Sequence, residues 1–135
     1  MARGPLCAAV TFTGDVPQVR DYAWAMDVGC LTPGSNEGFS NAVIEQMATG
    51  LPMIVTDVGG NAEAIAEGES GYVIRPGASA ELAQALRRLY EDSLLRRDMG
   101  RAARARVEER FSLEQMCARH AQLYRLLLDE PQQAR

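Results

Sequence analysis

Short apolar runs and amphipathic segments alternate along this chain, and the alternation predicts its secondary structure. Apolar runs predict short strands at 9–13, 28–31, 53–56 and 72–74. Apolar positions three and four residues apart predict helices at 17–26, 41–49, 61–65, 78–90, 93–109 and from 113 onward. Because strands and helices alternate, we expect an α/β fold with a parallel sheet.

Several helix ends carry recognisable signals. Asn61 can cap the short helix that follows it, and Ser112 with Gln115 three residues later forms a capping box. The last helix has an apolar stripe that includes His120, the only histidine. We therefore expect the His120 side chain to be semi-buried rather than catalytic. Residues 129–135 are expected to be a frayed tail.

The composition is that of a globular protein, and it narrows the possible chemistry. The 135 residues suffice for one domain with a single core, and the 47% of apolar residues argue against disorder. With 14 cationic and 18 acidic residues the net charge is −4, so no nucleic-acid partner is expected. Every cation is arginine. The absence of lysine excludes a P-loop and a Schiff-base mechanism.

Cysteine usage gives no sign of a metal centre. Cys7, Cys30 and Cys117 are far apart in the sequence and lack zinc-type spacing. Unpaired thiols, together with the lack of an apolar run of membrane-spanning length, favour a soluble cytoplasmic protein. We therefore expect neither a bound metal nor a cofactor.

The most informative stretch is Glu37–Glu45, which has an acidic residue at each end and small, polar residues between them. Glu37 follows the predicted strand at 28–31, whereas Glu45 lies on the early part of the next predicted helix. In open α/β sheets, ligands bind at the carboxyl ends of the strands. The exposed N–H groups at the start of a helix suit a phosphate. We expect a ligand that contains phosphate at this edge of the sheet.

The motifs of this chain resemble those of the retaining glycosyltransferases of family 4, also called the group 1 glycosyl transferases, which have the GT-B fold. The mark of that family is a pair of glutamates separated by seven residues, as Glu37 and Glu45 are here. The resemblance extends over roughly residues 10–128. The matching segments are 12–16, 37–52, 54–63, 68–73 and 110–112.

The resemblance implies a truncated Rossmann-like parallel sheet of about four strands, flanked by helices and followed by C-terminal helices. Residues 1–135 would form a single partial domain, the nucleotide-sugar-binding half of a GT-B enzyme. Glu37 would lie beside the donor sugar as the catalytic residue, and Glu45 would accept hydrogen bonds from the ribose hydroxyls. The donor-binding residues implied are Gly38, Phe39, Ser40, Asn41, Glu45 and Val16.

Two parts of the family pattern have no match in this sequence. The family carries a Gly-Arg pair and a nearby lysine that neutralise the diphosphate, and it carries an N-terminal domain with the acceptor site. Losing charge stabilisation of a leaving group costs orders of magnitude in rate. We therefore expect the chain by itself to be inactive, and we expect it to self-associate or to repack its first strand. The sequence does not decide whether the nucleotide of the donor is UDP, GDP or ADP.

Alternative interpretations stay open at this point. The chain could be a non-catalytic remnant or a partner-binding module that kept the fold. It could also belong to another GT-B enzyme, such as a nucleotide-sugar epimerase, although the paired glutamates disfavour this. Gly59–Gly60 is either a tight turn or a close backbone approach to the ligand. The arginines within 96–110 are most simply a solvated helix face; the alternative is contact with acidic lipid headgroups, as in a peripheral membrane enzyme.

Overall fold

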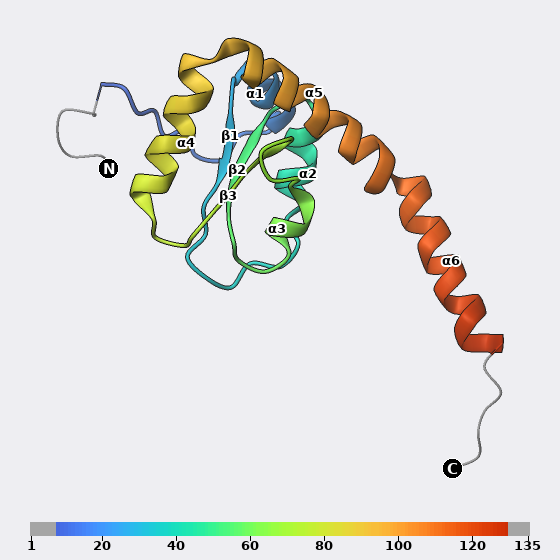
Figure 1. Cartoon of the computed structure of the whole chain (residues 1–135). Coiled ribbons are helices and arrows are strands. Elements are labelled where there is room, and N and C mark those ends of the chain that lie inside the picture. Colours follow the sequence, from blue (N-terminus) through green and yellow to red (C-terminus); the bar gives the residue numbers. More distant parts are fainter. Residues whose placement is uncertain (1–7, 130–135) are drawn as a thin grey trace.

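The structure, a computed structural model, describes residues 8–129. Three strands form a parallel sheet, and helices lie against both of its faces (Figure 1). In chain order the elements are α1 (Val19–Ala25), β1 (Gly29–Leu31), α2 (Asn41–Ala48), β2 (Met53–Thr56), α3 (Asn61–Ala64), β3 (Gly71–Ile74), α4 (Ser79–Glu91), α5 (Ser93–Arg110) and α6 (Leu113–Asp129).

The sheet has the order β1-β2-β3, and both strand pairs are parallel. Cys30 pairs with Ile54, which in turn pairs with Tyr72. All four residues of β2 are buried, as expected for a central strand covered on both faces. The predicted α/β class and the alternation of strands and helices are confirmed, and the predicted strand at 53–56 has the observed bounds of β2.

The predicted strand at 9–13 is wrong, and the sheet has three strands instead of about four. Within the described residues, no strand precedes β1, and the segment 9–13 is exposed. The physical reason lies in the strand order. In a sheet with the order 3-2-1-4-5-6, segment 9–13 would be strand 3 and β1 would be strand 4. Strand 3 pairs with strand 2 in that order and does not touch strand 4. Without a neighbouring strand, the segment has nothing with which to form a ladder of β-sheet hydrogen bonds.

The core has two parts, one on each face of the sheet. On one face, Met53 and Val55 of β2 pack with α2, α3 and the C-terminal half of α5. On the other face, Ile54 packs with α4 and with Met99 of α5. Met47, Met53 and Leu89 are completely buried. α5 therefore contributes side chains to both parts of the core and ties them together.

The two edges of the sheet differ. On the outer edge of β3, the N–H groups of Val73 and Arg75 donate to the carboxylates of Glu67 (2.7 Å) and Glu81 (3.0 Å). The carbonyl of Gly71 accepts a hydrogen bond from the N–H of Gly68 (2.9 Å). β3 is thus closed by neighbouring groups, whereas no strand within residues 8–129 covers the outer edge of β1.

The last helix, α6, extends away from the rest of the molecule (Figure 1). Its apolar side chains are exposed, among them Leu123 and Leu127. His120 is exposed as well, so the expectation of a semi-buried histidine is wrong. Its Nδ1 lies 2.8 Å from the carbonyl oxygen of Met116, one turn earlier. The predicted tail beyond Asp129 and the thiol of Cys7 lie outside the described residues.

Of the two predicted helix caps, one is found in part and the other is wrong. The N–H of Gln115 donates to the hydroxyl of Ser112 (3.3 Å), which is one of the two hydrogen bonds of a capping box. Asn61 is the first residue of α3 rather than its cap, a place that Gly60 takes. The Asn61 side chain is completely buried, and neither of its polar atoms has a hydrogen-bond partner among the described residues.

Candidate functional site

The candidate site is built from the loop between β1 and α2, residues 32–40, at the carboxyl edge of the sheet. Two contacts fix this loop to the neighbouring strand end. The hydroxyl of Thr56, the last residue of β2, donates to the carbonyl of Pro33 (2.8 Å). The N–H of Gly60 donates to the carbonyl of Gly38 (3.0 Å). The loop therefore lies where ligands bind in α/β folds.

Within this region, the two glutamates of the motif have different surroundings. Glu37 lies in the loop and is half-buried, whereas Glu45 lies on α2 and is exposed. Because Asn41 and Glu45 are four residues apart on α2, they share one face of that helix. Glu37 is thus partly covered by the rest of the molecule, whereas the Glu45 side chain is exposed to solvent.

The start of α2 matches the prediction that a helix begins near Ser40. Ser40 is the N-cap residue and has an extended backbone. In the described part of the chain, its hydroxyl makes no capping hydrogen bond to α2. N–H groups in the first turn of a helix have no partner within the helix. This terminus therefore offers donors to an anion.

Phe39 anchors the C-terminal end of the loop. Its ring lies 5.4 Å from the ring of Phe111, centre to centre, with the planes tilted by 41°. This geometry is typical of favourable aromatic pairs. Phe111 follows α5 directly and is half-buried beside the core. The loop is thus held between the sheet and the end of α5.

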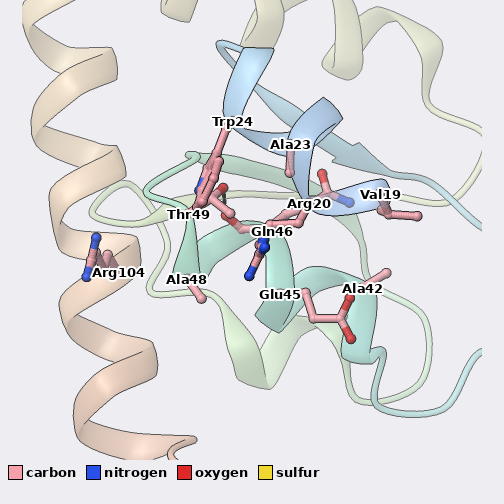
Figure 2. A pocket seen from close by; sticks show the side chains of 10 residues that line it. All are labelled: Val19, Arg20, Ala23, Trp24, Ala42, Glu45, Gln46, Ala48, Thr49 and Arg104. Atoms are coloured by element: carbon pink, nitrogen blue, oxygen red, sulfur yellow. Dashed lines mark hydrogen bonds between the residues drawn. The ribbon is translucent and has the colours of Figure 1, made fainter. Parts of the chain in front are cut away.

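Glu45 also borders a groove of about 440 Å³ between α1 and α2 (Figure 2). The guanidinium of Arg20 lies 5.1 Å from the centre of the Trp24 ring, also on α1. The residues that line the groove are Val19, Arg20, Ala23, Trp24, Ala42, Glu45, Gln46, Ala48, Thr49 and Arg104. The structure thus brings Glu45 together with α1. Val16 is half-buried in the segment that precedes α1, and the groove begins at Val19.

The arginines of α5 are not the uniform solvated face that the sequence predicts. Arg106 donates to the carbonyls of Ala64 (2.7 Å) and Glu63 (2.9 Å) at the end of α3. Arg96 donates to the carbonyl of Leu89 (2.7 Å). These two side chains have structural partners, whereas Arg104 pairs with Glu108 on its own helix.

Two negative findings apply to residues 8–129. Their His, Cys, Asp and Glu side chains form no group of three or more that could hold a metal ion. None of their helices is both long enough and apolar enough to cross a membrane.

Parallel strands, helices on both faces and a helix N-terminus at the carboxyl edge define a Rossmann-like α/β domain. Residues 2–92 match the family model described as "Glycosyl transferases group 1". The chain belongs to this family, as its motifs indicated.

Curated relatives agree with this assignment. Over 98 residues the chain is 33% identical to the capsular polysaccharide biosynthesis glycosyltransferase CapM of Staphylococcus aureus, covering 73% of this chain and 26% of that protein. Over 115 residues it is 33% identical to N-acetyl-alpha-D-glucosaminyl L-malate synthase of Bacillus anthracis, covering 85% and 30%. The chain thus spans less than a third of the length of these relatives.

Solved structures confirm the fold. A sucrose-phosphate synthase from Thermosynechococcus elongatus matches with a TM-score of 0.82 at 31% identity, covering 93% of this chain and 32% of that one. The Anabaena protein Alr3699/HepE, solved in complex with UDP and glucose, matches with a TM-score of 0.82 at 26% identity, covering 88% and 32%. The fold is therefore that of part of a GT-B glycosyltransferase, as predicted.

Sequence reasoning missed some residues that shape the loop. In the sequence, Phe111 stands out only as part of a matching segment, and its contact with Phe39 joins positions 72 residues apart. The sequence leaves the role of Gly59–Gly60 open, and in the structure this turn packs against the loop backbone. A glycine pair directly after a buried strand is the available signal, because such pairs mark close backbone approaches.

Proposed function

We propose that this chain supplies the nucleotide-sugar-binding part of a retaining glycosyltransferase. Glu37 lies beside the donor sugar in this proposal, and the N–H groups of Gly38, Phe39 and Ser40 meet the sugar and the diphosphate. Glu45 accepts hydrogen bonds from the ribose hydroxyls, since the two oxygens of a carboxylate suit a vicinal diol. Asn41 and Val16 complete the donor site, with Val16 near the base.

One observation carries this proposal: the loop of residues 32–40, which contains Glu37, runs from the carboxyl end of β1 into an uncapped helix N-terminus. A negative diphosphate is stabilised there by the N–H groups and by the helix dipole. Membership of the glycosyltransferase family and the match to a protein solved with UDP and glucose support the same ligand class.

We further propose that the chain alone transfers no sugar. Its 14 cations are all arginine, so no lysine can neutralise the leaving diphosphate. In this proposal the acceptor site belongs to an N-terminal domain, and the cations belong to an earlier part of this same domain. Transfer from the donor is expected to need no metal or cofactor. We also place the enzyme in the cytoplasm, which its unpaired thiols favour.

The test is a series of thermal melts of the purified chain with UDP, GDP and ADP, each with and without its sugar. A ligand at 100 times its Kd adds about 2.7 kcal/mol to the free energy of unfolding, which raises Tm by several degrees. We expect one nucleotide to raise Tm and so to identify the base, with UDP as the first candidate. If none of them raises Tm at millimolar concentration, this chain does not hold a donor.

Glu45→Ala provides the matched variant for this test. Loss of the carboxylate that meets the ribose should weaken nucleotide binding by about 1.5–3 kcal/mol, or roughly tenfold to a hundredfold in Kd. The control is Glu91→Ala, an exposed carboxylate on α4, which packs on the opposite face of the sheet from α2. If Glu45→Ala and Glu91→Ala have the same Kd for the nucleotide, Glu45 does not contribute to the site.

A further inference from the structure

We infer that the Gly59–Gly60 turn after β2 is a positioning element that sets where the Glu37–Phe39 loop lies. The ligand part of this inference rests on the proposed function, whereas the loop part rests on the packing alone. Both residues of the turn face the loop: Gly59 lies against Glu37 and Gly38, and Gly60 lies against Gly38 and Phe39.

Gly59 leaves room for the loop backbone. A β-carbon at this position would overlap the carbonyl oxygen of Glu37 and would lie 2.7 Å from that of Gly38, closer than the 3.0 Å that β-carbons in proteins respect. These obstacles are backbone atoms, so no side-chain rotation can relieve the overlap. Gly59 also has a φ of +60°, which residues with a side chain rarely adopt.

Gly60 holds the next part of the loop. Its N–H donates to the carbonyl of Gly38 (3.0 Å), and a β-carbon here would lie 3.1–3.3 Å from atoms of Phe39. Phe39 in turn packs on Phe111. The loop therefore lies in a slot with the glycine turn on one side and the Phe111 ring on the other.

This slot positions the part of the proposed site that contains Glu37, and it does not contact the part that contains Glu45. Glu37 and the N–H groups that follow it belong to the loop, so a displaced loop moves the groups that meet the diphosphate and the sugar. Glu45 lies on α2, which packs on the core through Val43 and Met47. A change at Gly59 should thus weaken contacts to the outer phosphate more than contacts to the nucleoside.

The experiment compares Gly59→Ala with Gly77→Ala in the full chain. Gly77 has a φ of +75°, but a β-carbon added there would meet no atom within 4 Å beyond its two chain neighbours, so its substitution brings similar backbone strain without the collision. UDP and UMP are the probes, and Kd is measured for both. Gly59→Ala should lose about tenfold or more in affinity for UDP and less than about threefold for UMP, whereas Gly77→Ala should change neither by more than about threefold.

A variant that is merely less stable would lower Tm without changing the ratio of the two Kd values. An equal loss for UDP and UMP in Gly59→Ala would therefore overturn the inference. Should Gly59→Ala fail to fold, Gly60→Ala takes its place, because its β-carbon meets Phe39 less severely and its φ is −91°. The same change in ratio, of about threefold, is then expected.

Amide hydrogen exchange separates this inference from the proposed function. If the unsubstituted chain binds none of UDP, GDP and ADP, the proposed function fails, and exchange within residues 38–41 still tests the slot. Faster exchange there in Gly59→Ala than in Gly77→Ala supports the positioning role. Equal exchange in the two variants rejects it, whatever the nucleotides do.

Discussion

Arg104 and Arg106 of α5 are two positions apart and differ in what they bind. Arg106 donates two hydrogen bonds to carbonyls at the end of α3, while Arg104 forms an exposed pair with Glu108. The last carbonyls of a helix have no partner within it, so Arg106 serves as a C-terminal cap supplied from another helix. The sequence cannot distinguish the two arginines, because the partners of Arg106 lie 42 and 43 positions away.

We predict that Arg106→Met lowers the free energy of unfolding by about 1.5–3 kcal/mol, because hydrogen bonds from a charged donor are lost. The matched control, Arg104→Met, should cost about 0.3–0.5 kcal/mol, as exposed pairs four residues apart on a helix do. Urea unfolding of both variants measures the difference. Equal losses would show that the contacts of Arg106 with α3 contribute nothing to stability.

Among the elements, β3 shows how an edge strand is closed by side chains. Glu67 accepts a hydrogen bond from the N–H of Val73 in this strand, and Glu81 accepts one from the N–H of Arg75 directly after it. Unpaired N–H groups at an edge invite pairing with another chain. We predict that Glu67→Ala speeds amide exchange at Val73 by about tenfold, which corresponds to the loss of one hydrogen bond to a charged acceptor. The control, Glu69→Ala, removes an exposed carboxylate from the same turn. Unchanged exchange at Val73 would contradict this description of the edge.

The hydrogen bonds of Glu81 make the contribution of this edge to stability depend on pH. Hydrogen bonds from the backbone N–H and then from the side chain of Arg75 lower the pKa of Glu81 below its ordinary value of 4.5. A pKa lowered by folding means that this interaction stabilises the fold above pH 4.5 and is lost as the pH falls through the lower, folded-state pKa.

We therefore predict that the free energy of unfolding falls less steeply below pH 4.5 in Glu81→Gln than in the unsubstituted chain. The glutamine keeps an acceptor for the N–H of Arg75 but does not titrate. Chemical unfolding over a pH series measures both slopes. Parallel curves would show that Glu81 has no part in the acid sensitivity.

The elements that the sequence predicted well are those whose pattern is local. Strand β2 and the start of α2 follow from an apolar run and from turn residues beside it. The segment 9–13 has the composition of a strand, but a strand also needs a neighbour, which periodicity cannot show. Asn61 likewise suits a cap by residue type, yet Gly60 precedes it as the N-cap and the packing of α3 buries its side chain.

The candidate site follows the same division. The order of strand, loop and helix places Glu37 and Glu45 at the carboxyl edge from the sequence alone, and the fold confirms their elements. Their roles toward a donor stay predictions. The contacts that hold the loop come from Thr56, Gly60 and Phe111, and tertiary packing alone brings these together.

For the molecule as a whole, stability should come from the sheet and its covering helices and not from α6. Leu89 is completely buried and Leu127 is 59% exposed. We predict that Leu89→Ala costs about 2–5 kcal/mol in the free energy of unfolding, and that Leu127→Ala costs less than about 0.5 kcal/mol. Calorimetry or urea unfolding measures both values. A large loss in Leu127→Ala would mean that α6 packs against the body of the protein in solution.

The open edge of β1 and the apolar side chains of α6 also lead us to expect self-association of the purified chain. Light scattering at two protein concentrations measures the mean mass. A mass that rises with concentration supports this expectation, and a monomer at millimolar concentration contradicts it.

The pair of rings formed by Phe39 and Phe111 has a thermodynamic consequence. Phe111 and Ser112 join α5 to α6, so the ring that supports the loop also belongs to the junction that sets the direction of α6. If two arrangements of this junction differ in how they support Phe39, then fixing α6 and filling the loop with a ligand are linked equilibria. Linkage is reciprocal: fixing α6 would change the equilibrium constant for ligand binding by the same factor by which ligand binding changes the equilibrium constant for fixing α6.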